Sequence, residues 1–266
     1  MPAPRPALAS APALTGDFMT ILFVADLHLH SGIPGIADGF IAYLRHRAAG
    51  AEALYILGDL FEGWIGDDGC GPFENRIIDA LRQCSDAGTA VYFMHGNRDF
   101  LIGEEFARRA GATLLDDPTP IELEPGSPAL LMHGDSLCTM DEEYMQFRAM
   151  TRDPEWQRRT LAMPLEQRQA LAGQLREHSA SANRDKQDEI MDVTPQAVID
   201  IMAEWNVSTL IHGHTHRPAE HELTLPDGTP ARRHVLGDWH ADSGWQLRLE
   251  HGRLTLERFT LSALTD

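Results

Sequence analysis

Five short motifs of this chain combine carboxylate, amide and imidazole side chains, which are the groups that bind divalent metal ions. The motifs are Asp26-x-His28, Gly58-Asp59, Gly96-Asn97, His133 and Gly213-His214-x-His216. None contains a thiolate, and such a donor set suits Mn²⁺, Fe or Zn²⁺, with the oxygen content favouring Mn²⁺. Each motif alone has a simpler interpretation, because Gly-Asp is common in turns and a single histidine after a strand is most often structural. The ordered set is far more specific than any of its members.

The motifs supply seven candidate ligands, which are too many for one tetrahedral ion. They are Asp26, His28, Asp59, Asn97, His133, His214 and His216. A carboxylate has two oxygens and can bridge two ions, and Asp59 is the candidate for that position. Two ions about 3.5–4 Å apart that share a carboxylate are the arrangement used in two-metal hydrolysis of phosphoesters. The sequence therefore predicts two divalent metal ions, most simply Mn²⁺, in a phosphoester hydrolase.

Each motif follows a short apolar run of strand length. The runs are residues 20–25, 53–57, 90–94, 129–132 and 207–211. Helical spacing of apolar residues predicts helices near 36–47, 73–87, 103–110 and 195–205. This alternation implies an α/β sheet with helices on its faces, and such sheets place their sites just past the strand ends. If the first strand continued, its alternation would place Asp26, His28 and His30 on one side.

The rest of the chain has a different pattern. Residues 119–123 and 129–132 form an expected strand pair around a turn at 124–128, and further strands are expected near 220–225, 233–236, 245–249 and 254–259. Residues 140–191 are polar, helical in pattern and rich in arginine. We interpret 1–18 as a disordered extension and 19–266 as one domain that includes a helical insertion at about 140–191.

Composition restricts the class of partner. The formal net charge is -18, and a protein this acidic lacks the basic footprint of a nucleic-acid-binding protein. Three cysteines without CxxC spacing argue against a disulfide framework and fit a reducing cytosol. No apolar run is long enough to span a membrane, and the start of the chain lacks the pattern of a secretory signal.

In this order, the five motifs resemble the calcineurin-like metallophosphoesterases, over residues 20 to about 216. The resemblance implies a four-layer α/β/β/α sandwich. It also implies that Asp26, His28, Asp59 and His216 hold one metal ion. Asp59, Asn97, His133 and His214 would hold the other.

Longer segments resemble a narrower family within that group, the UDP-2,3-diacylglucosamine diphosphatases of lipid A biosynthesis. The segments are residues 25–29, 57–68, 95–101, 132–139 and 211–219. The resemblance implies that a metal-activated water attacks the pyrophosphate of a UDP-linked diacylated glucosamine lipid. The products would be UMP and 2,3-diacylglucosamine 1-phosphate. It further implies a cytoplasmic protein, peripheral on the inner-membrane surface, and we expect a monomer.

The same resemblance assigns catalytic roles to Asn97, Arg98 and His214, which would contact the substrate phosphates. For Arg98 the alternative is a salt bridge to Asp99 or to another loop carboxylate. Contacts to the sugar and its acyl groups would come from Asp141, Ser179, Asn183 and Lys186. Lys186 is the single lysine among 22 basic residues, although one residue does not exclude chance.

The insertion offers apolar side chains for a slot that would hold acyl chains. They are Tyr144, Met145, Phe147, Met150, Trp156, Leu161, Met163, Leu165, Leu171 and Leu175. The alternative is that they pack the insertion against the body. Trp64 is likewise either core or pocket wall, and Asp67 and Asp68 are expected to be structural or to support the metal ligands from behind. Arg152, Arg158 and Arg159 either form a solvated face or meet anionic lipid headgroups.

Two other functions are compatible with the motifs. One is a nucleotide pyrophosphatase or phosphodiesterase that acts on a substrate without acyl chains. The other is a non-catalytic scaffold on the same fold. A scaffold would not need the complete set of ligands that this chain has.

Overall fold

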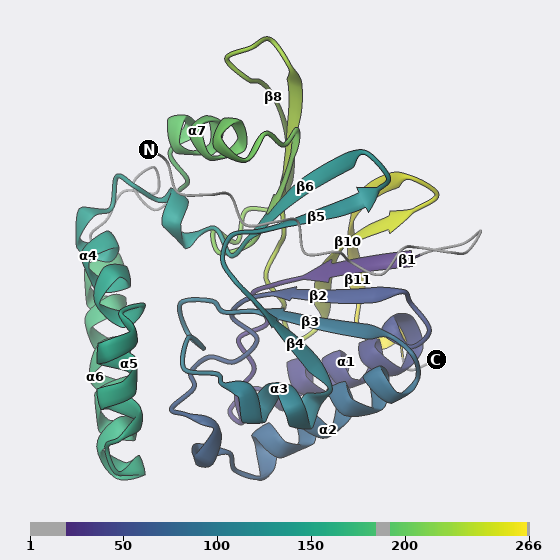
Figure 1. Cartoon of the computed structure of the whole chain (residues 1–266). Coiled ribbons are helices and arrows are strands. Elements are labelled where there is room, and N and C mark those ends of the chain that lie inside the picture. Colours follow the sequence, from purple (N-terminus) through teal and green to yellow (C-terminus); the bar gives the residue numbers. More distant parts are fainter. Residues whose placement is uncertain (1–19, 185–191, 265–266) are drawn as a thin grey trace.

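The computed structural model describes residues 20–184 and 192–264, with the side chains of 177–184 left undescribed (Figure 1). The expected extension at 1–18 therefore lies outside the described residues. The sequence prediction missed one short half-buried strand, β4 (Ala112–Leu115), which comes directly after helix α3 (Glu104–Ala110). The other predicted strands and helices are present, with ends that differ by up to three residues.

Six strands form the first sheet, in the order β11-β10-β1-β2-β3-β4. The central strands are parallel: β1 (Thr20–Val24), β2 (Ala53–Leu57), β3 (Ala90–Met94) and β4 (Ala112–Leu115). The hairpin of β10 (Ser243–Glu250) and β11 (Arg253–Thr260) pairs antiparallel with β1. All five residues of β2 are buried, as expected for a strand covered on both faces.

Three helices cover the outer face of this sheet. They are α1 (Pro34–Tyr43), which continues as one π-helical turn over Leu44–Ala48, α2 (Pro72–Asp86) and α3 (Glu104–Ala110). The rings of Phe40 and Tyr43 on α1 pack edge-on against Trp239, which precedes β10. This packing fixes the segment after β9 next to the loop after β1.

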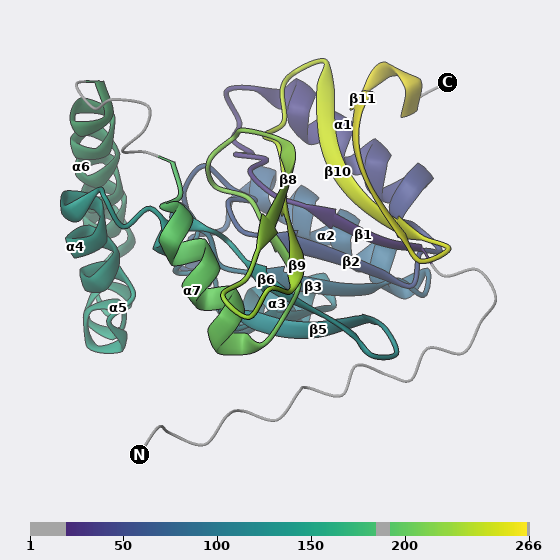
Figure 2. The same cartoon turned by 90° about the horizontal axis from the view of Figure 1, so that it is seen from above.

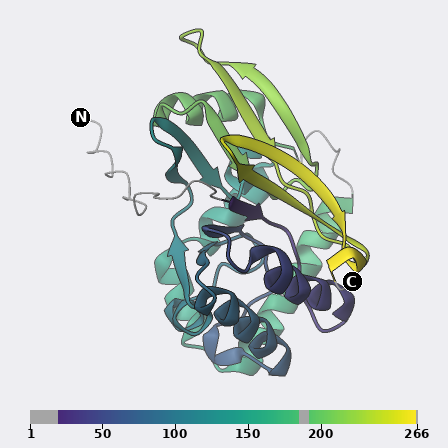
Figure 3. The same ribbon diagram turned by 90° about the vertical axis from the view of Figure 1, so that its right-hand side faces the viewer.

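Five strands form the second sheet, in the order β5-β6-β7-β9-β8. They are β5 (Thr119–Glu124), β6 (Ser127–Met132), β7 (Thr209–His212), β8 (Ala219–Thr224) and β9 (Pro230–Val235). Apolar side chains from both sheets, including Phe23, Leu131 and Ile211, form the core between them. Helix α7 (Pro195–Trp205) covers the outer face through Val198 and Met202. Figure 3 shows helices α1–α3 and α7 on opposite sides of the strands, which is the predicted four-layer sandwich.

The insertion consists of α4 (Glu142–Thr151), α5 (Pro154–Leu161) and α6 (Leu165–Arg184). These helices lie together beside the sandwich, at the end where the loops after β1, β2 and β3 emerge (Figures 1 and 2). The carboxylates of Asp141 and Asp153 cap α4 and α5 by accepting backbone N–H bonds from Tyr144 and Trp156. No helix in the described ranges is both long and apolar enough to cross a membrane.

Candidate metal centre and active site

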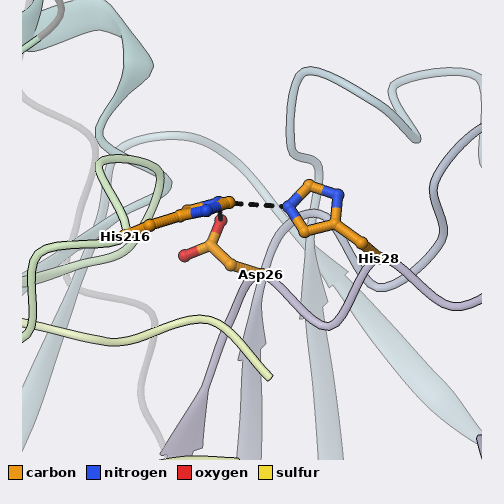
Figure 4. Close-up of side chains that lie close together, drawn as sticks. All are labelled: Asp26, His28 and His216. Carbon is orange, nitrogen blue, oxygen red and sulfur yellow. Dashed lines mark hydrogen bonds and ion pairs between the residues drawn. The ribbon is translucent and has the colours of Figure 1, made fainter. Parts of the chain in front are cut away.

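Loops after five strands bring the seven candidate ligands together. Asp26 and His28 follow β1, Asp59 follows β2 and Asn97 follows β3, while the remaining three histidines follow β6 and β7. One group joins Asp26, His28 and His216 (Figure 4). In it, the Nε2 atoms of His28 and His216 are 3.1 Å apart, and His216 Nε2 is 3.6 Å from Asp26 Oδ1.

A second group forms around Asn97, whose Oδ1 lies 3.0 Å from His133 Nε2 and 2.9 Å from His214 Nδ1. Asp59 lies between the two groups. Its Oδ2 is 3.8 Å from His28 Nε2, and its Oδ1 is 3.9 Å from His133 Nε2. Asp59 therefore occupies the position that a bridging carboxylate requires.

Five of the seven residues have left-handed backbone conformations. Their φ angles are 57° for Asp26, 49° for His28, 54° for Asp59, 71° for His214 and 54° for His216. Such angles are uncommon outside glycine, and cluster at sites where the surrounding structure compensates the strain. Here the compensation includes backbone hydrogen bonds from Asp26 N to Gly58 O, 3.1 Å, and from His28 N to Asp59 O, 2.9 Å.

The left-handed residues correct one prediction from the sequence. Strand β1 ends at Val24, so strand alternation does not align Asp26 with His28. His30, which alternation would place beside them, instead accepts a hydrogen bond from Gly32 N on its Nδ1. Turns in the loop, rather than the pleat of a strand, aim Asp26 and His28 at the same point.

Two glycines permit the close approach of the loops. Gly58 has φ of +90°, and a Cβ there would lie 2.5 Å from His133 Nδ1. A Cβ on Gly96 would lie 2.0 Å from Asp59 Oδ1. Both motif glycines therefore have a steric purpose, which is to let the ligand loops touch.

Asp99 holds the loops after β2 and β3 in register. Its buried carboxylate accepts backbone N–H bonds from Asp59, Leu60, Phe61 and Gly96, at 2.8–3.3 Å. Burial, together with the charge of Asp59, raises the pKa of Asp99 to about 6. Since backbone groups occupy this carboxylate, Asp99 is not the salt-bridge partner of Arg98, whereas Glu62, another loop carboxylate, is near enough for the charge of Arg98 to lower its pKa.

Arg98 lies at the site with an unpaired side-chain donor. Its Nε is buried and makes no hydrogen bond within the described part of the chain, while its backbone N–H donates to Asp59 Oδ1, 2.8 Å. Arg98 lines the cleft that contains His28, Asp59 and His216. An unpaired buried donor costs free energy unless a ligand accepts from it, and a phosphate oxygen is a suitable acceptor.

The centre also fits a bound cation electrostatically. Asp26 Oδ1 is buried and accepts no hydrogen bond from any residue that the structure describes. Burial lowers the pKa of His216, but the carboxylates of Asp238 and Asp26, 3.4 and 3.6 Å from its ring nitrogens, outweigh burial and raise the pKa to about 10. Nearby carboxylates likewise outweigh burial and raise the pKa of His28 and of His133. These shifts indicate a negative potential that divalent cations would neutralise.

An apolar cavity adjoins the metal-ligand cleft and shares Asn97, Arg98 and Tyr144 with it. Its apolar wall comes partly from the insertion and partly from the loops after β2 and β3. The lining includes Trp64, Ile65, Phe100, Leu101, Phe147, Trp156, Leu171 and Leu175. Trp64 is thus both core, at 5% exposed, and cavity wall.

Only part of the insertion's apolar set faces this cavity. Tyr144, Phe147, Trp156, Leu171 and Leu175 line it. Met150, Leu161, Met163 and Leu165 are exposed instead. Asp141 caps α4 and lies in the metal-ligand cleft. The side chains of Ser179 and Asn183, and the whole of Lys186, lie outside the described residues.

Sequence reasoning missed a buried polar network between the insertion and the centre. Asp135, fully buried behind His133, accepts hydrogen bonds from Tyr144 Oη at 2.7 Å and Arg148 Nε at 3.0 Å. Arg152 donates to the carbonyls of His95, 3.2 Å, and Gly96, 3.0 Å, beside ligand Asn97. Arg152 therefore belongs neither to a solvated face nor to a lipid-facing surface. In the sequence, the one indication of this network was Asp135, which follows His133-Gly134.

The fold and this set of candidate ligands indicate a metallophosphoesterase, and similarity to known proteins supports that class. The family model for calcineurin-like phosphoesterases matches residues 19–218, and the chain belongs to that family. It is 62% identical to a UDP-2,3-diacylglucosamine hydrolase of Chromohalobacter salexigens over 87% of this chain and 94% of that protein.

Two further relatives have the same name. One, from Marinobacter nauticus, is 56% identical over 85% of this chain and 92% of its own length. The other, from Cellvibrio japonicus, is 51% identical over 91% of this chain and 100% of its own length.

Proposed function

We propose that this protein hydrolyses the pyrophosphate of UDP-2,3-diacylglucosamine and releases UMP and 2,3-diacylglucosamine 1-phosphate. The observation behind this proposal is that a polar cleft and an apolar cavity meet. A cleft of carboxylates and imidazoles meets an apolar cavity, and Asn97, Arg98 and Tyr144 line both. A substrate that joins a pyrophosphate to acyl chains needs such a junction. The names of the close relatives support the same substrate.

The proposed centre holds two divalent ions. Asp26, His28, Asp59 and His216 would bind one, and Asp59, Asn97, His133 and His214 the other. The donor atoms, the orphaned Asp26 oxygen and the negative potential all fit such ions, and the carboxylate and amide oxygens beside the four imidazoles favour Mn²⁺. When bound, the ions neutralise phosphate charge and lower the pKa of a bound water.

The chain's own residues would orient the pyrophosphate. The Arg98 guanidinium, with its buried unpaired Nε, would donate to a phosphoryl oxygen and stabilise the charge that develops there. Asn97 and His214 lie in contact with each other beside Arg98 and would complete the phosphate contacts. Tyr144 separates this polar space from the apolar cavity and packs against the ring of His214, with ring centroids 5.7 Å apart.

The apolar cavity would take the acyl chains. Packing of Phe100 against Trp156 joins the body to the insertion at its wall, with ring centroids 6.0 Å apart. Asp141, Ser179, Asn183 and Lys186 are the proposed contacts to the sugar and its acyl groups. Since one chain supplies all the proposed site residues, we propose that the protein acts as a monomer.

We further propose that the protein works on the cytoplasmic face of the inner membrane as a peripheral protein. The end of the insertion has three exposed apolar side chains, Leu161, Met163 and Leu165. The exposed Arg158 and Arg159 lie close to them in sequence. Apolar side chains next to basic ones are suited to shallow contact with an anionic lipid surface.

Release of UMP from UDP-2,3-diacylglucosamine with added Mn²⁺ tests the proposal. We expect turnover that Asp59→Ala abolishes while the thermal unfolding midpoint stays near that of the wild type. UDP-sugars without acyl chains should react far more slowly. Comparable rates on both substrates would favour a general nucleotide pyrophosphatase, and no turnover of any phosphoester would favour a scaffold.

A further inference from the structure

Two histidines of the candidate centre have a carboxylate behind the ring. His28 Nδ1 lies 3.0 Å from Glu62 Oε2, and His216 Nδ1 lies 3.4 Å from Asp238 Oδ2. The opposite nitrogens of both rings point inward and face each other, as Figure 4 shows. Each ring is therefore held between a carboxylate outside and the centre inside.

The other two histidines lack this arrangement. His133 Nδ1 is 2.9 Å from the backbone carbonyl of Leu57, which is a neutral acceptor. His214 turns its Nδ1 toward the amide of Asn97, so that nitrogen faces the centre. The two halves of the centre thus differ in the acceptor at the outer histidine nitrogen, because Asp135 behind His133 is hydrogen-bonded by Tyr144 and Arg148 and not by the imidazole.

Both carboxylates are anchored by backbone hydrogen bonds to the loop that contains Asp26 and His28. Glu62 N donates to Leu29 O, 3.2 Å, next to the bridge between Leu29 and Phe61. Trp239 N, adjacent to Asp238, donates to Asp26 O, 3.2 Å. The Trp239 ring is buried against Phe40 and Tyr43, which immobilises that segment. His240 Nε2 also faces Asp238, at 3.5 Å, from the exposed side.

A carboxylate behind a ligating histidine has two effects. It keeps the proton on the outer nitrogen, so the inner nitrogen has its lone pair free, and it increases the electron donation of the ring to a metal. A neutral carbonyl also fixes the tautomer but adds no negative charge. Metal binding should therefore be stronger in the half of the centre whose histidines have a carboxylate at the outer nitrogen.

We propose that Glu62 and Asp238 are positioning residues that make the Asp26–His28–His216 half of the centre the tighter of two metal sites. This inference rests on the proposed metal-dependent function. Neither residue is a candidate ligand, and each acts through the histidine in front of it. Removing either carboxylate should weaken one ion and leave the other nearly unchanged.

Titration of the metal-free protein with Mn²⁺, with free Mn²⁺ measured by electron paramagnetic resonance, tests this inference. We expect two ions per wild-type chain, with unequal affinities. Glu62→Ala and Asp238→Ala should each weaken the tighter site by about 10- to 100-fold, the usual effect of losing such a partner. Glu62→Gln and Asp238→Asn should weaken it less, because the amide oxygen still accepts a hydrogen bond.

Glu220→Gln provides a matched control. Glu220 faces His234 Nδ1 at 3.6 Å on strands β8 and β9, so it is also a carboxylate–histidine pair. Neither residue contacts a candidate ligand in the described part of the chain. This variant should bind both ions as the wild type does. Unfolding midpoints of all variants, measured with chelator, identify any that fail to fold.

The outcomes separate the inference from the proposed function. Two ions in the wild type with unchanged affinities in all four Glu62 and Asp238 variants would overturn the inference alone. Equal weakening of both sites would also overturn it, since the inference assigns the effect to one half. Failure of the wild type to bind Mn²⁺, Fe²⁺ or Zn²⁺ would overturn the metal centre itself.

Discussion

At the scale of single residues, the most informative atom outside the ligand set is Arg98 Nε. It is buried and unpaired within the described residues, and it lines the cleft that contains the candidate ligands. The neighbouring Asp99 does not neutralise it, because four backbone N–H groups occupy that carboxylate. Arg98 is therefore arranged to receive an anion rather than to stabilise the loop.

Replacing Arg98 tests this role. Arg98→Ala should lower kcat for UMP release by about 10²–10³-fold, which is typical for loss of one donor to developing charge. Arg98→Lys should recover only part of the rate, because an ammonium group lacks the forked geometry of guanidinium. Steady-state kinetics at saturating Mn²⁺ give the result. An Arg98→Ala variant with wild-type kcat would show that the side chain does not act in the reaction.

The two motif glycines make a second residue-scale prediction. Gly58→Ala places a Cβ against His133 and Gly96, so it should eliminate activity and weaken Mn²⁺ binding. Gly88→Ala is the control, because Gly88 also has a positive φ, +104°, but nothing lies within 4 Å of its added Cβ. It should cost only about 1–2 kcal/mol of unfolding free energy. Similar activities for the two variants, measured by UMP release, would contradict the steric explanation.

At the scale of secondary structure, an ion pair of α6 joins the insertion to the body, in addition to the Arg148–Asp135 pair of α4. Arg168 on α6 is only 4% exposed and forms a bidentate pair with Asp68, at 2.7 and 2.5 Å. It also donates to the carbonyl of Ile65, 2.6 Å, on the cavity-lining loop. The sequence prediction treated Asp68 as structural, which agrees with this contact, but α6 gave no signal for its partner.

Loss of the Arg168–Asp68 pair should weaken binding of the acyl chains more than it slows hydrolysis. We expect Arg168→Met to raise KM for UDP-2,3-diacylglucosamine by about tenfold, comparable to one charged hydrogen bond. Hydrolysis of a small phosphodiester without acyl chains should be unaffected. Arg82→Met removes an exposed pair with Asp86 on α2 and should leave both substrates unchanged. A kcat loss on both substrates would instead place Arg168 in the catalytic apparatus.

Features of the fold that depend on residues close in sequence could be predicted, whereas features that depend on contacts between distant residues could not. The strands β2 and β3 and helix α7 follow from local apolar patterns, and their predicted bounds match the structure. The left-handed turns at Asp26 and His28 do not follow, because backbone contacts with the β2 loop create them. Glu62 and Asp238 are 176 positions apart, and only the packing of Trp239 on α1 brings the second to the site.

At the scale of the whole molecule, the insertion places an apolar end on a protein with a net charge of -18. Replacing Leu161, Met163 and Leu165 together by serine should reduce co-sedimentation with vesicles of phosphatidylethanolamine and phosphatidylglycerol at least severalfold. Ile33→Ser is the control, because Ile33 is equally exposed, at 42%, but precedes α1. Equal vesicle binding by all three proteins would exclude this end as the membrane contact.

The central claim is a binuclear metal centre joined to an acyl-binding cavity. A crystal structure with Mn²⁺ and 2,3-diacylglucosamine 1-phosphate, with anomalous diffraction recorded for manganese, tests it most directly. We expect two anomalous peaks that share Asp59, and acyl density between Trp64, Phe147 and Leu171. A single peak, peaks remote from Asp59, or acyl chains bound elsewhere with this cavity empty would contradict it.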